Sequence, residues 1–143
     1  MYYLWEGMIS RKSKYALKAV GYLAAKHQSG PVLIAQISEQ RSIPLKFLES
    51  ILLTLKNQGI LRSKKGKGGG YFLSRPPGKI TVAEVLRAIE GPIAPLPCVS
   101  INFYEKCEDC LERTCGVRRI MAVTRDATLK VLEKSTLVDL VDR

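Results

Sequence analysis

A run rich in lysine and glycine, residues 64–70 (KKGKGGG), constrains the fold of this chain most strongly. Residues 60–63 and 71–74 flank it and have the composition of short strands. Glycines let the backbone turn tightly and approach another surface, while the lysines present positive charge. The pattern predicts a β-hairpin with a cationic tip. A phosphate-cradling loop fits less well, because the run lacks the G-x-x-x-x-G-K-[ST] order and precedes a strand. A flexible surface hairpin is the remaining alternative.

Two helices are expected just before the hairpin. Residues 34–41 read as a short helix, residues 42–44 as a turn, and residues 45–58 as a second helix closed by Gly59. The second helix has one apolar side, formed by Leu48, Ile51, Leu52 and Leu55. This is the helix-turn-helix layout, in which the second helix enters the major groove of DNA. Helical hairpins also occur in bundles, so it is the adjacent wing-like hairpin that favours DNA binding.

Positive charge is concentrated in the first half of the chain. Residues 8–80 hold 14 Lys or Arg against two Glu, a net charge of +12, whereas residues 81–143 hold 9 against 10 Asp or Glu, a net charge of −1. This distribution is typical of a surface that meets phosphates, and a basic face kept for solubility is the alternative. No apolar run approaches the ~20 residues of a transmembrane helix, and residues 1–7 do not resemble a signal peptide. We expect a cytoplasmic protein without membrane contact.

Three further helices are expected around this unit. The first is capped by Ser13 or a neighbour and runs to about Gln28. Another opens at Thr81 with Glu84 as its capping-box partner. A long helix, residues 117–134, carries an apolar stripe that can pack within the chain or against a second copy, and we favour a dimer arm. Residues 136–141 form a last short turn. The fold class is mainly α with a small β-hairpin wing (α+β).

All four cysteines lie within residues 98–115, as Cys98, Cys107, Cys110 and Cys115. Thiolates are soft ligands that suit iron–sulphur clusters and zinc, and ligands this close in sequence can converge on one site. In the reducing cytosol, clustered cysteines are more often metal-binding or redox-active than structural disulfides. We therefore interpret this segment as a sensor.

Five stretches of the chain carry a resemblance to a known family. They are SRKSKYALKAVGYLA, IPLKFLESILLTLKNQGIL, KKGKGGGYFLS, ITVAEVLRAIEGPIAP and STLVDL, spread over residues 8–141. Together they resemble the Rrf-two family of bacterial winged-helix regulators. The resemblance implies a winged helix-turn-helix with a long C-terminal dimerisation helix, a homodimer, and binding to a palindromic operator in double-stranded DNA.

The resemblance also assigns candidate contact residues. DNA contacts map to the start of the second helix and the tip of the wing, which are Lys46, Glu49, Ser50, Lys64, Lys65 and Lys67. Glu49 could accept a hydrogen bond from a cytosine amino group, or could only orient a neighbouring lysine. The long helix would supply the dimer interface through Val117, Ile120, Met121, Thr124 and Val131.

The cofactor is less constrained than the fold. Cluster-bearing family members carry three cysteines at about six-residue intervals, whereas Cys107, Cys110 and Cys115 are spaced three and five apart. Some members place a histidine three residues after the last cysteine, and Arg118 stands there in this chain. We favour a [2Fe–2S] cluster held by these three cysteines and Cys98, with the fourth ligand open. Zinc, a thiol or disulfide switch, or no cofactor remain alternatives.

These observations predict a DNA-binding regulator, not an enzyme. Residues 8–91 would form the DNA-binding domain, residues 92–116 the cysteine-containing sensor segment, and residues 117–143 the dimerisation helix and tail. We expect a dimeric repressor that senses redox, iron–sulphur or nitrosative status. A regulator without metal, acting by thiol switching or through a metabolite or partner protein, is the alternative. A redox enzyme or electron carrier is disfavoured, since nothing resembles a cofactor cradle or an acid–base pair.

Overall fold

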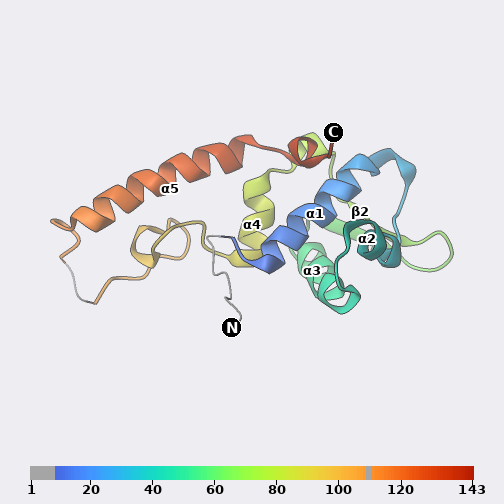
Figure 1. Ribbon diagram of the computed structural model, residues 1–143, viewed down its shortest axis with the longest axis horizontal. Coiled ribbons are helices and arrows are strands. Elements are labelled where there is room, and N and C mark those ends of the chain that lie inside the picture. Colours follow the sequence, from blue (N-terminus) through green and yellow to red (C-terminus); the bar gives the residue numbers. More distant parts are fainter. Residues whose placement is uncertain (1–8, 109–110) are drawn as a thin grey trace.

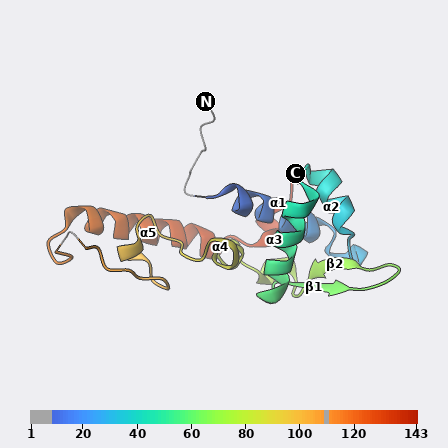
Figure 2. The same ribbon diagram turned by 90° about the horizontal axis from the view of Figure 1, so that it is seen from below.

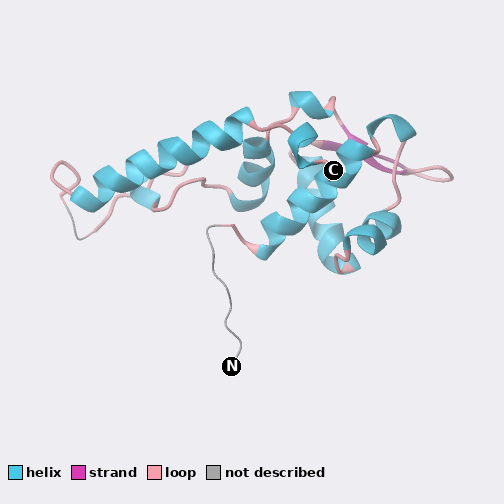
Figure 3. Ribbon diagram, turned by 45° about the horizontal axis from the view of Figure 1, so that its top comes forward, coloured by secondary structure: helices cyan, strands magenta, loops and turns pink. Residues whose placement is uncertain are grey.

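The computed structural model of the chain describes residues 9–108 and 111–143. Helices dominate it, and one antiparallel pair of strands forms a hairpin (Figure 3). Its elements are α1 (Arg11–Ala25), η1 (His27–Ser29), α2 (Ile34–Arg41), α3 (Leu45–Asn57), β1 (Leu61–Lys64), β2 (Gly70–Leu73), η2 (Pro77–Lys79), α4 (Val82–Glu90), η3 (Pro97–Val99), α5 (Gly116–Lys134) and η4 (Leu137–Leu140), where η is a 3₁₀ helix. The sequence-based fold class is confirmed.

The chain divides in shape into two regions. We call residues 9–91 the winged body and residues 92–134 the arm. In Figures 1 and 2, α5 projects from one end of the body and the hairpin from the opposite end. The segment that follows α4 runs outward beside α5, η3 contacts α5, and α5 itself returns to the body. None of the described helices is long and apolar enough to cross a membrane.

The core of the winged body forms around α1. Ala16 and Ala19 are fully buried, and their small side chains let α3 and α4 approach the α1 backbone. The apolar stripe predicted for α3 is buried as a whole and comprises Leu48, Ile51, Leu52 and Leu55. On the far side of α1, a Cβ added to Gly21 would lie 2.9 Å from the Leu140 carbonyl oxygen. Glycine therefore lets η4 pack directly on α1.

Hydrogen bonds from side chains fix the helix starts. α1 begins at Arg11 with Ser10 as its cap, where the sequence suggested Ser13 or a neighbour. The Ser13 amide donates to the Ser10 hydroxyl at 3.1 Å. α1 ends at Ala25, where the sequence suggested about Gln28, and η1 covers the remaining turn. The capping box of α4 is confirmed, since Glu84 N–H donates to Thr81 Oγ1 at 3.1 Å and Thr81 N–H donates to Glu84 Oε2 at 2.8 Å.

The end of α5 is fastened to the winged body by backbone hydrogen bonds. The Val82 amide donates to the Ser135 carbonyl at 2.9 Å, and the Leu137 amide donates to the Ile80 carbonyl at 3.1 Å. Leu137 is fully buried in the body's core. As expected for residues 136–141, the chain after α5 therefore turns back and packs on the body.

Candidate nucleic-acid interface and cysteine segment

The turn between α2 and α3 is held rigidly. Ser42 ends α2 in the left-handed conformation, with φ 53° and ψ 46°. The Ser38 hydroxyl donates to the Ile43 carbonyl at 2.6 Å, and the Ile43 amide donates to the Ser38 carbonyl at 3.1 Å. Ile43 itself is buried, so the turn is anchored in the core. The angle between the two helices is thus set by local hydrogen bonds and packing together.

The first turns of α3 present polar side chains to solvent. Lys46, Glu49 and Ser50 are all exposed. Pro44 precedes the helix and offers no side-chain cap to the first amides. Within the described part of the chain, the Glu49 carboxylate makes neither an ion pair nor a hydrogen bond. The buried apolar face therefore fixes the helix, and its polar face remains accessible to solvent.

The wing is supported by a third segment that sequence reasoning did not identify. β1 and β2 pair antiparallel, with Leu61 opposite Leu73 and Lys64 opposite Gly70. Val32 bridges to Tyr71 on the other edge of β2, with hydrogen bonds of 2.9 and 2.8 Å in the two directions. The only sequence signal for this bridge was Val32 directly after Pro31, which is too short for a strand pattern. β2 is therefore central, and the wing is more rigid than a lone hairpin.

Glycines at the wing tip are required by close backbone approaches. A Cβ on Gly70 would lie 2.3 Å from the Val32 carbonyl oxygen, and a Cβ on Gly69 would lie 2.2 Å from that of Lys64. The Gly69 amide closes the tip by donating to the Gly66 carbonyl at 3.0 Å. Lys64, Lys65 and Lys67 are all exposed around this tip. The tip therefore presents its positive charge on an ordered backbone.

The outer side of α5 carries an uncovered apolar stripe. Of the five residues expected at a dimer interface, Val117, Ile120 and Val131 are each between 58% and 62% exposed. Met121 and Thr124 are half-buried. Val123 lies on the same side and is 64% exposed. The sequence interpretation omitted Val123, although its spacing from Ile120 could have identified it.

The beginning of the cysteine segment is bound to α5. Cys98 lies in η3 and is only 7% exposed. Its neighbour Val99 is buried, and the Val99 carbonyl accepts a hydrogen bond of 2.8 Å from the Arg125 guanidinium on α5. Arg125 therefore ties the surroundings of the first cysteine to the middle of the long helix.

The end of the segment forms the start of α5. Cys115 is the N-cap residue, and its Sγ accepts a hydrogen bond from the Arg118 amide at 3.4 Å. Cys107 is partly exposed, whereas the predicted ligand Cys110 lies outside the described residues. In the same segment, the Tyr104 hydroxyl donates to the Glu112 carboxylate, and this hydrogen bond raises the pKa of Tyr104.

The described thiols by themselves do not form a metal site. Among residues 9–108 and 111–143, no three Cys, His, Asp or Glu side chains are grouped so that they could hold a metal ion. Arg118 Nε is nevertheless buried without a hydrogen-bond partner among these residues, next to the cap formed by Cys115. Because Cys110 lies outside the described residues, the described donor set is incomplete.

The Glu90 carboxylate lies at the end of the winged body, just before the arm begins. Glu90 ends α4, and its Oε1 accepts hydrogen bonds from the Ser10 amide at 2.9 Å and the Ser13 hydroxyl at 2.7 Å. Burial acts to raise the pKa of Glu90, but these hydrogen bonds and nearby Lys12 outweigh it and lower the pKa. The contact joins the start of α1 to the end of α4. No local sequence pattern pointed to it.

Comparison with known proteins agrees with this geometry. Residues 9–143 match the Rrf2 (Rrf-two) family model, described as an iron-dependent transcriptional regulator. A putative HTH-type transcriptional regulator, rrf2-like, from Rhodobacter capsulatus is 41% identical over 94% of this chain and 92% of its own. The HTH-type transcriptional regulator IscR from Xenorhabdus nematophila is 32% identical over 94% of this chain and 85% of its own.

The fold is likewise that of a solved regulator. The structure of CymR (YrzC), the global cysteine regulator of B. subtilis, superposes with a TM-score of 0.77 and 34% identity, over 92% of this chain and 94% of that one. These relatives are transcriptional regulators, not enzymes. The chain therefore belongs to the Rrf2 family and is a DNA-binding transcriptional regulator.

Proposed function

We propose that the protein is a homodimeric, sequence-specific repressor that binds a palindromic operator and reports redox, iron–sulphur or nitrosative status through residues 98–115. The observation that carries the DNA-binding part is the pairing of a fixed helix with a fixed wing. Both elements expose polar or cationic side chains, Lys46, Glu49, Ser50, Lys64, Lys65 and Lys67, on a backbone held by buried contacts. In this proposal, residues 8–91 form the DNA-binding domain, residues 92–116 the sensor segment, and residues 117–143 the dimerisation helix and tail.

The two elements would read DNA in different ways. Lys46 and Ser50 at the start of α3 are suited to phosphates and base edges in the major groove, and Glu49 is suited to the amino group of cytosine. The wing lysines would act through charge at the phosphates or in the minor groove. Base preference should therefore depend on α3, and overall affinity on the wing.

The apolar stripe of α5 supports a dimer. Side chains such as Ile120 and Val131 gain free energy when a second apolar surface removes them from water, by roughly 25 cal/mol per Å². A second copy of the same helix supplies such a surface in a two-fold arrangement, which also matches the symmetry of a palindromic operator. We place Val117, Ile120, Met121, Thr124 and Val131 in this interface.

Contacts within the arm support a route from the cysteines to DNA. The sensor segment is bound to α5 at its cap, Cys115, and through the Arg125 hydrogen bond to Val99. α5 is bound to the body through Arg87 and Glu133, at 2.8 Å, and through the backbone of Ser135. A chemical change at residues 98–115 would shift the start of α5, and hence the distance between two recognition helices in a dimer.

For the cofactor, we propose a [2Fe–2S] cluster with Cys107, Cys110 and Cys115 as ligands and Cys98 as the candidate for the fourth. The iron-dependent description of the family and the four thiols support this proposal. Bound there, a cluster would supply a redox-sensitive group. Anaerobic purification with a visible spectrum and iron, sulphide and zinc assays on one sample tests it. Colourless, metal-free protein that reconstitution leaves unchanged would instead indicate a thiol switch.

DNA recognition is tested without knowing the operator. Selection from random duplexes should return a palindrome, and binding to it should weaken steeply with salt. Replacing Lys65 and Lys67 by Ala should weaken binding to every sequence and reduce the salt slope by about 2 per protomer, or about 4 for the dimer. Glu49→Ala should instead relax the preferred base at one position. A chain that binds random and selected duplexes equally would refute sequence-specific regulation.

Sensing is tested on the same selected operator. The wild type should lose affinity when treated with oxidant or nitric oxide. The variant with Cys107, Cys110 and Cys115 all replaced by Ala should not respond. An unchanged response in that variant would exclude the cysteine segment as the sensor.

A further inference from the structure

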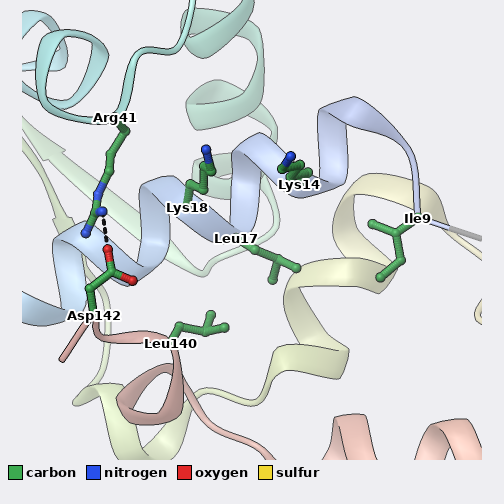
Figure 4. A pocket seen from close by; sticks show the side chains of 7 residues that line it. All are labelled: Ile9, Lys14, Leu17, Lys18, Arg41, Leu140 and Asp142. Carbon is green, nitrogen blue, oxygen red and sulfur yellow. Dashed lines mark hydrogen bonds and ion pairs between the residues drawn. The ribbon is translucent and has the colours of Figure 1, made fainter. Parts of the chain in front are cut away.

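A pocket with cationic and apolar walls lies on the winged body, away from both the wing and the cysteine segment. We call it the Arg41 pocket. Its volume is about 450 Å³, within the range of small-molecule sites. It is lined by Ile9, Lys14, Leu17, Lys18, Arg41, Leu140 and Asp142 (Figure 4). We propose that it binds a small organic anion, a carboxylate carrying an apolar group.

The charge of the pocket selects the sign of the ligand. Lys14, Lys18 and Arg41 contribute three cations, while Asp142 contributes one carboxylate. α1 supplies both lysines, and α2 supplies Arg41 at its last residue. Three cations around a small volume attract an anion, and one carboxylate leaves them incompletely neutralised.

Arg41 is held in place as an anion receptor. Its guanidinium lies over the Tyr22 ring, 5.5 Å from the ring centroid, and its side chain is only 23% exposed. The Tyr22 hydroxyl accepts a hydrogen bond of 2.7 Å from Gln36. Stacking of this kind fixes the planar fork of arginine, which lowers the entropy lost when it binds a carboxylate.

A ligand would meet Arg41 at the end of its guanidinium. Its Nη1 binds the Asp142 carboxylate, whereas its Nε is buried from solvent. A ligand carboxylate would therefore compete with Asp142 for the terminal guanidinium nitrogens. Asp142 shows that a carboxylate reaches this guanidinium, and its own side chain is 74% exposed and replaceable.

The apolar side of the pocket selects the rest of the ligand. In Figure 4, Leu17 on α1 and Leu140 on the C-terminal tail extend below α1, while Arg41 and Asp142 lie together at one end. Ile9 lines the other end. A ligand with its carboxylate at Arg41 can therefore lay a short hydrocarbon group against Leu17 and Leu140. Inorganic anions lack this part and should bind more weakly.

The site is tested with carboxylates of increasing chain length. Acetate, hexanoate and phosphate, with hexanol as the uncharged partner of hexanoate, are titrated into the full chain while amide chemical shifts are recorded. Hexanoate should bind with a dissociation constant on the order of a millimolar, as expected for a fragment-sized ligand. Its binding should change the amide chemical shifts of α1 and of Arg41. Acetate, phosphate and hexanol should bind at least about tenfold more weakly. Equal binding of phosphate and hexanoate would overturn the carboxylate assignment.

Variants connect the binding to this pocket. Arg41→Gln should weaken hexanoate binding about tenfold or more, since it removes a charge-assisted hydrogen bond. Asp142→Asn should strengthen it roughly threefold, because the competing carboxylate is lost. Lys18→Gln should weaken it, whereas the matched variant Lys130→Gln, on exposed α5, should not. Saturable binding that none of the three pocket variants alters, or no binding by the wild type, would overturn the proposal. Lys18→Gln keeps the test valid even where Arg41→Gln perturbs folding.

Discussion

The winged body and the arm are built from one chain in opposite ways. In the body, α1 to α4 surround a continuous core that includes Leu23, Ile51 and Leu52. In the described part of the arm, buried side chains are confined to residues 98–100 and Leu129, while large apolar side chains such as Ile120 and Leu111 are exposed. The body can therefore fix its DNA-facing elements by itself. The arm, by contrast, leaves much of its apolar surface exposed.

This difference suits the two regions to the two proposed roles, which are DNA recognition and sensing. Operator recognition needs side chains held in one geometry, and a dense core provides that. Sensing needs a region whose conformation responds to a small change in free energy, and regions with few buried contacts open most readily. Substitutions in each region can therefore test this contrast.

The largest contrast is expected from one substitution made in both regions. Leu52→Ala removes a side chain that is 0% exposed, and it should lower the free energy of unfolding by about 3 kcal/mol. Leu111→Ala, at a position 77% exposed in the arm, should cost less than about 0.5 kcal/mol. Urea unfolding at one protein concentration measures both. Similar losses for the two variants would show that the arm has a core of its own.

The second prediction concerns the exposed stripe. Ile120→Glu places a charge where a second copy of α5 is proposed to pack, and burying an unpaired carboxylate is costly. The dimer should dissociate at least about a hundredfold more readily, as measured by analytical ultracentrifugation. The winged body should keep its unfolding free energy, since Ile120 lies outside its core. Lys56→Glu, at an exposed position on α3 of the winged body, serves as the control and should leave the dimer intact.

Sequence reasoning worked best where structure is set locally. The apolar stripe of α3, the turn at residues 42–44 and the capping box of Thr81 each depend on residues within one or two helical turns, and each is present. Strand limits were off by one residue, since β1 runs to Lys64 and β2 begins at Gly70. The sequence pattern places Gly70 in the loop because it is a glycine. In the structure it belongs to β2, where the Val32 backbone approaches so closely that no side chain would fit.

Contacts between distant segments could not be predicted in the same way. The bridge of Val32 to Tyr71 and the hydrogen bonds of Glu90 with Ser10 and Ser13 join residues far apart in the sequence. No periodicity marks such pairs. The same difficulty applies to the arm. The spacing of apolar residues identified a stripe on α5, but it could not show which of these residues pack within the chain. Cluster ligation and the DNA contacts remain predictions.

The third prediction uses the carboxylate at the junction of the two regions. Because its pKa is lowered in the folded state, Glu90 stabilises the protein above the ordinary carboxyl pKa of 4.5, and this contribution is lost as pH falls through the lower, folded value. Glu90→Gln should cost about 1 kcal/mol near neutral pH and flatten the loss of stability in acid. Thermal unfolding from pH 7 to pH 3 measures it. Glu39→Gln, at an exposed position on α2, should leave the pH profile unchanged.

The smallest effect concerns the ion pair that joins the arm to the body. Arg87 on α4 and Glu133 on α5 lie 2.8 Å apart, and Arg75 and Glu84, both within the body, lie 3.1 Å apart. The four side chains are between 32% and 53% exposed. Each pair should therefore contribute under about 1 kcal/mol to stability. Double-mutant cycles with Ala measure each coupling free energy and cancel the separate loss of the α4 cap in Glu84→Ala.

The two couplings should differ in a defined direction. Holding Glu133 beside Arg87 also requires the arm to stay in place, and that ordering reduces the net gain. The Arg87–Glu133 coupling should therefore be the smaller one, about 0.3 kcal/mol or less, and should fall further in 0.5 M salt because both partners contact solvent. A coupling larger than that of Arg75 with Glu84 would mean that the arm is fixed as firmly as the body. Signals from the cysteines would then have to move the two regions as one.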